Sequence, residues 1–154
     1  MSWLVQRAFG DEEFRQHGGE LWRNFKLALS STVDSFNEIY TKPSQKEFEV
    51  SARQKIDDKC FRVRSIPLPG ENERVIEVWL KPAKHLIEIS RINGGGKPIM
   101  LSIATGNAGL ELRHGDQTIS VEEASQMTLE DFLFPDGIHR EPLNPPKPDL
   151  PTSW

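Results

Sequence analysis

The sequence predicts an α+β fold. We expect a long N-terminal amphipathic helix on one face of a roughly six-stranded antiparallel sheet, then a short C-terminal helix and a proline-rich tail. Apolar residues recur at three- and four-residue steps over residues 11–41, and they alternate with polar residues over residues 46–119. Six of the eleven prolines lie in the last 20 residues. These observations predict a single α+β domain over residues 1–134 and an extended tail over residues 135–154.

The first helix is expected over residues 11–41, because its apolar side chains fall within an arc of about 120° at about 100° per residue. Leu27 alone lies on the opposite face, and Lys42-Pro43 suits the end of the helix. The pair Gly18-Gly19 costs about 2 kcal/mol relative to alanine. We therefore expect the helix to kink there or to begin near Glu20. The apolar stripe consists of Phe14, Leu21, Trp22, Phe25, Leu29, Val33, Phe36, Ile39 and Tyr40.

The alternating segments predict strands with one buried face and one solvated face. Their connections are rich in glycine and proline and too short for a crossover helix, so we expect an antiparallel meander. On the solvated face, Glu49 and Glu77 would flank Arg62 or Arg64 as cross-strand ion pairs. The buried set is Phe48, Val50, Ala52, Phe61, Val63, Ile76, Val78, Leu80, Ile87, Ile89, Ile99, Leu101, Ile103, Leu110 and Leu112.

A second helix is predicted from the capping box at Ser120-Val-Glu-Glu123, in which each end residue bonds the other's backbone. It should reach about Phe134, since Pro135-Asp-Gly137 follows. Its inward residues are expected to be Val121, Ala124, Met127 or Thr128, and Phe132.

Composition excludes several classes of protein. The net charge is -4 over 154 residues, which argues against a general nucleic-acid binder. The lone Cys60 excludes an intramolecular disulfide and a multi-cysteine metal site. No apolar run approaches the roughly 18 residues of a membrane span, and the start lacks the apolar run of a signal peptide. We expect a cytoplasmic protein with no nucleic-acid or membrane partner.

The chemical motifs are weak. Asp57 and Asp58 interrupt the basic stretch at residues 53–64, which has no exposed aromatic residue for base stacking. The segment Gly94-Gly-Gly-Lys97 precedes a proline and a strand, unlike a phosphate-binding loop. The four histidines lack metal-site spacing, and no GxSxG motif is present. We therefore predict no metal, no cofactor and no catalytic residue.

The first functional hypothesis is a non-catalytic binding protein that recognises a protein partner or associates with itself. Its candidate partner-binding residues are Trp79, on the solvated sheet face, and Leu150 and Trp154, in the tail. Trp3 is a further tryptophan outside the expected core. Trp79 either caps an apolar edge or contacts a partner. The tail either folds back over the core as a strap or presents its two PxxP spacings to a partner.

The alternative hypothesis is a small-molecule-binding protein or an enzyme, with a pocket between the sheet and the helices. The candidate residues at the pocket mouth are His85, Arg91, His114 and Asp116. Gly18-Gly19 and the glycines at 94–96 would then form its mobile rims.

Overall fold

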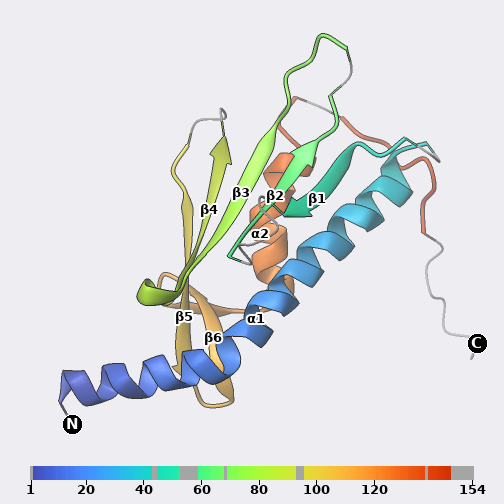
Figure 1. The fold of residues 1–154 in the computed structure, drawn as a ribbon. Coiled ribbons are helices and arrows are strands. Elements are labelled where there is room, and N and C mark those ends of the chain that lie inside the picture. Colours follow the sequence, from blue (N-terminus) through green and yellow to red (C-terminus); the bar gives the residue numbers. More distant parts are fainter. Residues whose placement is uncertain are drawn as a thin grey trace, which may run out of the picture.

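The computed structural model describes residues 2–42, 45–52, 59–67, 69–92, 96–137 and 139–146. Its order of elements is helix, meander, helix and tail, as the sequence predicts (Figure 1). The elements are α1 (Trp3–Tyr40), β1 (Phe48–Ala52), β2 (Cys60–Ser65), β3 (Val75–Lys81), the 3-10 helix η1 (Pro82–Lys84), β4 (Leu86–Ile92), β5 (Ile99–Gly106), β6 (Gly109–His114), β7 (Gln117–Ile119) and α2 (Val121–Leu133).

The sheet is an antiparallel meander with the strand order β1-β2-β3-β4-β5-β6-β7. The α+β class and the meander are confirmed, but the expected number of strands was one too low. The additional strand is β7, which has three residues and pairs with β6 through Leu112 and Ile119. Three residues are too few to show an alternating pattern, so the sequence predicts no strand over residues 117–119.

The sheet curls around α1. The helix contacts β1 at one edge of the strand order and also β5 and β6 near the other edge, so the strands between them must curve. At the β1 edge, the side chain of Asn37 fixes this contact, because its Nδ2 donates to the carbonyl of Phe48 at 2.8 Å. Its Oδ1 accepts from the backbone N–H groups of Glu47 and Phe48. At the start of β1, the side chain of Asn37 therefore makes the backbone hydrogen bonds that a neighbouring strand would otherwise make.

A single apolar core fills the space between the sheet and the helices. The predicted stripe of α1 supplies its helical side, and all five of its central residues are at most 7% exposed. At that level of burial the core is a packed interior rather than a cavity. These five residues are Trp22, Phe25, Leu29, Val33 and Phe36. The sheet supplies Phe48, Phe61, Val63, Ile76, Val78, Leu80, Ile87, Ile89, Leu101, Ile103, Leu112 and Ile119.

The helix α1 is continuous through Gly18 and Gly19, so a start near Glu20 is wrong. Figure 1 shows its axis changing direction between the darker blue part that extends past the sheet and the part that lies on the sheet. Gly18 is buried, and a Cβ atom there would lie 3.1 Å from the ring of Phe14. The packing of that ring accounts for one of the two glycines.

The second helix follows its prediction closely. Ser120 Oγ accepts from the N–H of Glu123 at 3.0 Å, and the Ser120 N–H donates to the Glu123 carboxylate at 3.2 Å. This reciprocal capping box satisfies two donors that the first turn would otherwise leave open. Ala124, Thr128 and Phe132 are buried, as expected.

The described part of the tail after Gly137, residues 139–146, has no helix or strand and packs against the end of α1; we call it the strap. The backbone N–H groups of Leu143 and Asn144 both donate to the carbonyl of Ile39, at 2.8 and 3.0 Å. Arg140 donates to both carboxylate oxygens of Glu47. The two backbone bonds use the carbonyl of Ile39, one of the groups that the C-terminus of a helix leaves without partners.

Candidate interaction surface

The first two turns of α1 form a helical segment that the sequence did not predict. Residues 3–9 contain neither glycine nor proline, and Ser2 caps them, since its Oγ accepts from the Val5 N–H at 3.3 Å. Serine is a favoured N-cap residue because it satisfies one of the open N–H groups of the first turn. We call residues 3–9 the apolar helix end.

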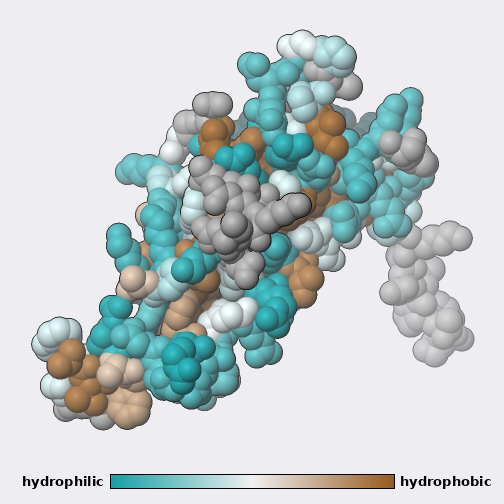
Figure 2. All heavy atoms as spheres, viewed as in Figure 1, coloured by the Kyte–Doolittle hydropathy of each residue, from teal (hydrophilic) through white to brown (hydrophobic). Residues whose placement is uncertain are grey.

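Large apolar side chains of the apolar helix end face solvent. Trp3 is 76% exposed, Phe9 62%, Leu4 61% and Val5 45%. Isolated exposed apolar residues are ordinary, whereas a contiguous group of them marks a surface for interaction. Figure 2 shows brown and tan spheres gathered at the lower left, where the N-terminal end of α1 lies in Figure 1.

The side chains remain uncovered because α1 extends past the sheet (Figure 1). The connection from β3 to β4 makes contacts near this end, where Arg7 Nη2 donates to the carbonyl of Ala83 at 2.5 Å. One turn further along α1, His85 Nε2 lies 2.8 Å from Asp11 Oδ1, and the His85 ring stacks on Phe14 at 4.8 Å. These contacts attach α1 to the β3–β4 connection through Arg7, Asp11 and Phe14 and leave the first turn of the helix beyond that connection.

The apolar residues lie on several sides of the helix. Successive residues of an α-helix are about 100° apart, so Trp3, Leu4 and Val5 point in three different directions. Phe9 lies close to the direction of Val5. A helix that is apolar on one stripe can rest on a flat surface, but one that is apolar on several sides is buried when it is bound. A concave apolar site therefore fits this end best.

The charges beside the apolar helix end are mainly acidic. Between Ser2 and Phe14, Arg7 stands against Asp11, Glu12 and Glu13. Arg7 is bonded to Asp11 at 3.0 Å, and Arg15 holds the pKa of Glu12 below its usual range by hydrogen bonding and by its charge. An anionic lipid surface attracts lysine and arginine rather than carboxylates. Asp11 and Glu12 already have partners in Arg7, His85 and Arg15, so the remaining charge is slightly acidic and suits a basic rim better than an anionic lipid surface.

Of the residues predicted to contact a partner, Trp79 belongs to the described residues and does not belong to the apolar helix end. Trp79 is half-buried on the sheet face that points away from α1, where it pairs in register with Cys60 on one side and with Glu88 on the other. Cys60 is buried. Leu150 and Trp154 lie outside the described residues.

The four residues predicted at a pocket mouth occupy separate places. His85 packs against α1, as described above, whereas Arg91 lies near the other end of β4, with its Nη2 3.8 Å from Asp131 Oδ2. His114 and Asp116 are exposed where β6 turns into β7. No hydrogen bond or ion pair joins any two of the four across the described ranges.

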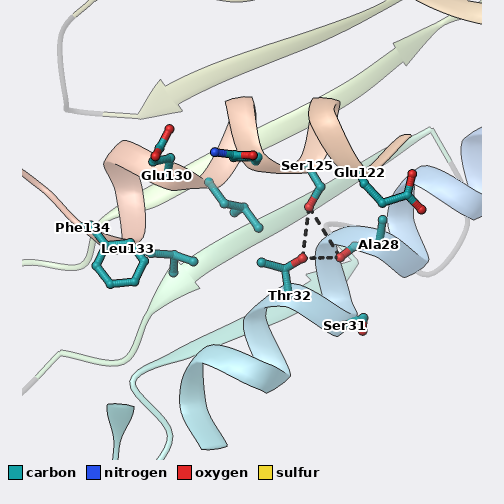
Figure 3. A pocket seen from close by; sticks show the side chains of 10 residues that line it. Ala28, Ser31, Thr32, Glu122, Ser125, Glu130, Leu133 and Phe134 are labelled. Carbon is teal, nitrogen blue, oxygen red and sulfur yellow. Dashed lines mark hydrogen bonds between the residues drawn. The ribbon is translucent and has the colours of Figure 1, made fainter. Parts of the chain in front are cut away.

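A hollow of about 420 Å³ lies between α1 and α2 (Figure 3). Three of its polar groups are bonded to one another: Thr32 Oγ1 donates to the Ala28 carbonyl at 2.8 Å and lies 3.2 Å from Ser125 Oγ. These bonds join the two helices and leave these hydroxyl groups with partners inside the protein. A second hollow, of about 950 Å³, lies at the C-terminal end of α1. None of the four predicted mouth residues lines either hollow.

Among the described residues, no group of three or more histidine, cysteine, aspartate or glutamate side chains is arranged to hold a metal ion. In that same part of the chain no helix is both long and apolar enough to cross a membrane. Comparison of the chain with protein-family models, with curated proteins and with solved structures finds no match. The function is therefore inferred from the residues of the surface itself.

Sequence reasoning found one residue of the apolar helix end and missed the others. Trp3 was recognised as a tryptophan outside the core, but Leu4, Val5 and Phe9 were not assigned to any element. The available signal was a serine followed by a glycine-free apolar segment, which is typical of a helix start. Because of the acidic run at residues 11–13 and the two glycines, the helix was expected to start later in the chain than it does.

Proposed function

We propose that this chain is a non-catalytic binding protein that inserts its apolar helix end into an apolar groove of a protein partner. The observation that supports this proposal is the exposure of Trp3, Leu4, Val5 and Phe9 on a helix that extends past the sheet. Burying about 100 Å² of each aromatic side chain at about 25 cal/mol per Å² contributes about 2–3 kcal/mol per residue before the cost of association. Two such residues suffice for a binding hot spot.

A groove on another protein fits the apolar helix end better than a second copy of this chain or a lipid surface does. A second copy of this helix packed alongside would cover one face and leave either Trp3 or Phe9 in solvent. A lipid surface would meet Asp11, Glu12 and Glu13 next to the apolar residues, with Arg7 already bonded within the protein. A groove with two walls covers more sides of a short helical segment than a flat surface or a single neighbouring helix does.

The proposal is tested by site-specific cross-linking in the cells that make the protein. A photoreactive p-benzoylphenylalanine replaces Phe9 in one form of the full chain and Leu27 in another. Leu27 is a matched control, because it lies on the same helix and is 60% exposed against 62% for Phe9. We expect the residue at position 9 to give a discrete heteromeric adduct and the residue at position 27 to give none.

Binding of the identified partner is then measured with purified proteins. The double variant Trp3→Ser/Phe9→Ser should bind at least about tenfold more weakly, whereas Leu27→Ser should bind like the wild type. Because all three residues are exposed, thermal unfolding should be unchanged in both variants. An adduct with the mass of two copies of this chain would contradict the proposal. So would lipid-vesicle binding that the double variant abolishes, or equal affinity of that variant for the partner.

A further inference from the structure

The hollow at the C-terminal end of α1 lies at the opposite end of that helix from the proposed partner surface. Its volume, about 950 Å³, is in the range of small-molecule sites. Residues from four parts of the chain line it: the end of α1, the segment before β1, the connection between β2 and β3, and the strap. Apolar contacts are available from Tyr40, Ile66 and Leu143. We call this hollow the Arg74 groove.

Arg74 is positioned in this groove by contacts that do not neutralise its charge. Its guanidinium carbon lies 5.0 Å from the ring centroid of Phe132 and 5.6 Å from that of Phe48. Its Nη1 donates to the carbonyl oxygen of Phe132 at 3.1 Å. A guanidinium has five N–H donors, and one carbonyl uses one of them. Arg74 forms no ion pair with a carboxylate of the described residues.

The carboxylate of Glu47, which lines the same groove, is already paired with Arg140. Glu47 accepts from Arg140 Nη1 at 2.8 Å and from Arg140 Nη2 at 2.6 Å, which uses both of its oxygens. Arg140 also lies over the ring of Phe48, so the two guanidinium groups share one aromatic ring, while the Glu47 carboxylate pairs with Arg140. Burial lowers the pKa of Arg74 and the positive charge of Arg140 lowers it further, whereas the charges of Glu47 and Glu71 act to raise it. Neither of these carboxylates forms an ion pair with Arg74 among the described residues.

Two further cations line the same groove. Lys42 and Lys46 are exposed, and neither forms an ion pair within the described part of the chain. The carboxylates in the lining are Glu47, held by Arg140, and Glu71, which makes no ion pair with Arg74 among the described contacts. In a protein whose net charge is -4, the cations of this groove outnumber its available carboxylates. An anionic group would supply the missing charge.

We propose that the Arg74 groove binds a small organic anion whose carboxylate or phosphate group lies against the Arg74 guanidinium, with Lys42 and Lys46 beside it. The planar fork of arginine recognises both kinds of oxyanion with paired hydrogen bonds, and lysine adds charge without fixed geometry. The apolar part of the ligand contacts Ile66 and Leu143. Leu143 belongs to the strap, so the strap forms one wall of the site.

The test follows the Nε–Hε signal of Arg74 by nuclear magnetic resonance in the full chain. The probes are inorganic phosphate, acetate, phenyl phosphate and benzoate, each titrated at constant ionic strength with sodium chloride as the balancing salt. We expect a saturable shift of the Arg74 signal, with a lower Kd for each phenyl-bearing probe than for its parent ion. A response to the phosphates identifies a phosphorylated ligand, and a response to the carboxylates identifies a carboxylic acid.

Matched charge variants distinguish binding at the Arg74 groove from a nonspecific effect of the protein's overall charge. Lys42→Ala/Lys46→Ala removes two charges from the groove, and Lys26→Ala/Lys84→Ala removes two exposed charges elsewhere. All four lysines are on the surface, so both variants should fold like the wild type. We expect at least about fivefold weaker binding in the groove variant and unchanged binding in the control. A shift that sodium chloride reproduces, the absence of saturation, or an equal loss in both variants would overturn the proposal.

Discussion

Arg140 connects the strap to the core through one side chain. Its guanidinium donates to both oxygens of Glu47 and lies 5.0 Å from the ring centroid of Phe36. The side chain of Arg140 is 13% exposed and that of Glu47 is 34% exposed, so the arginine of this pair is shielded from water better than the arginine of a surface pair. A lysine carries the same charge but has no planar fork for two parallel bonds or for stacking. We therefore expect Arg140→Lys to lower the free energy of unfolding by about 1–2 kcal/mol in urea denaturation.

The matched control for Arg140 is Arg64, which pairs with Glu49 on the outer face of the sheet. The side chains of that pair are 45% and 36% exposed. Exposed pairs contribute little because water screens them, so Arg64→Lys should lower the free energy of unfolding by less than about 0.5 kcal/mol. An equal loss of stability in both variants would show that the strap pair behaves as an ordinary surface pair.

The two kinds of ion pair also differ in how well the sequence could predict them. Cross-strand pairs of Glu49 and Glu77 with Arg62 or Arg64 were expected from strand alternation and meander order, and the structure pairs Arg64 with Glu49 and Arg62 with Glu77. Their partners are 15 residues apart along neighbouring strands. Arg140 and Glu47 are 93 residues apart and belong to no shared periodic pattern. Their contact depends on the path of the strap, which local sequence does not determine.

At the scale of elements, the glycine pair in α1 offers a direct comparison. A Cβ atom at Gly19 would meet nothing within 4 Å, whereas one at Gly18 would lie 3.1–3.2 Å from the Phe14 ring. Alanine is about 1 kcal/mol more favourable than glycine inside a helix. We expect Gly19→Ala to raise the free energy of unfolding by about 0.5–1 kcal/mol. Gly18→Ala should gain less or lose stability, because Phe14 is stacked on His85 and cannot shift freely.

Thermal and urea unfolding of the two single variants measure this difference. Equal stabilisation by both alanines would mean that the Phe14 ring moves without cost, and Gly18 would then have no packing role. Stabilisation by neither would mean that a bend at the pair, rather than the ring, requires both glycines.

The glycine pair also explains why one helix boundary was mispredicted. Local propensity disfavours a helix through two glycines by about 2 kcal/mol. The helix continues because Trp22, Phe25 and the residues beyond them anchor it to the sheet, while Arg7, Asp11 and Phe14 anchor its first half to the β3–β4 connection. Tertiary contacts thus outweighed a local cost that the sequence displayed. In contrast, α2 carries its own start signal at Ser120, and its boundaries were predictable.

At the scale of the whole molecule, the fold was more predictable than the sites. Periodicity specifies which face of each element is buried, and this determined the layers and the core. The two proposed sites lie at opposite ends of α1 and combine features that periodicity does not encode. The apolar helix end depends on how far α1 extends past the sheet, and the Arg74 groove depends on the pairing of Glu47 with Arg140 rather than with Arg74. The predicted mouth residues lie at the two ends of β4 and in the turn between β6 and β7, which the structure does not bring together.

The tail has two predicted roles, and experiment can separate them. The sequence left open whether the tail is a strap or a ligand for a partner. Residues 140–144 make the contacts with Glu47, Ile39 and Glu38 that a strap requires. Leu150 and Trp154, the tail residues proposed for a partner, follow these contacts in the sequence. The two functions can therefore belong to consecutive parts of one tail.

Two truncations test this division. Deleting residues 138–154 removes the bidentate pair and the bonds to the end of α1, so it should lower the free energy of unfolding by about 2–3 kcal/mol and the Tm by about 5–10 °C. Deleting residues 147–154 keeps all of these contacts and should leave the Tm within about 2 °C of the wild type. Differential scanning calorimetry on the three chains distinguishes the outcomes. An unchanged Tm after the longer deletion would refute the strap, and a large decrease after the shorter one would mean that Leu150 and Trp154 stabilise the fold themselves.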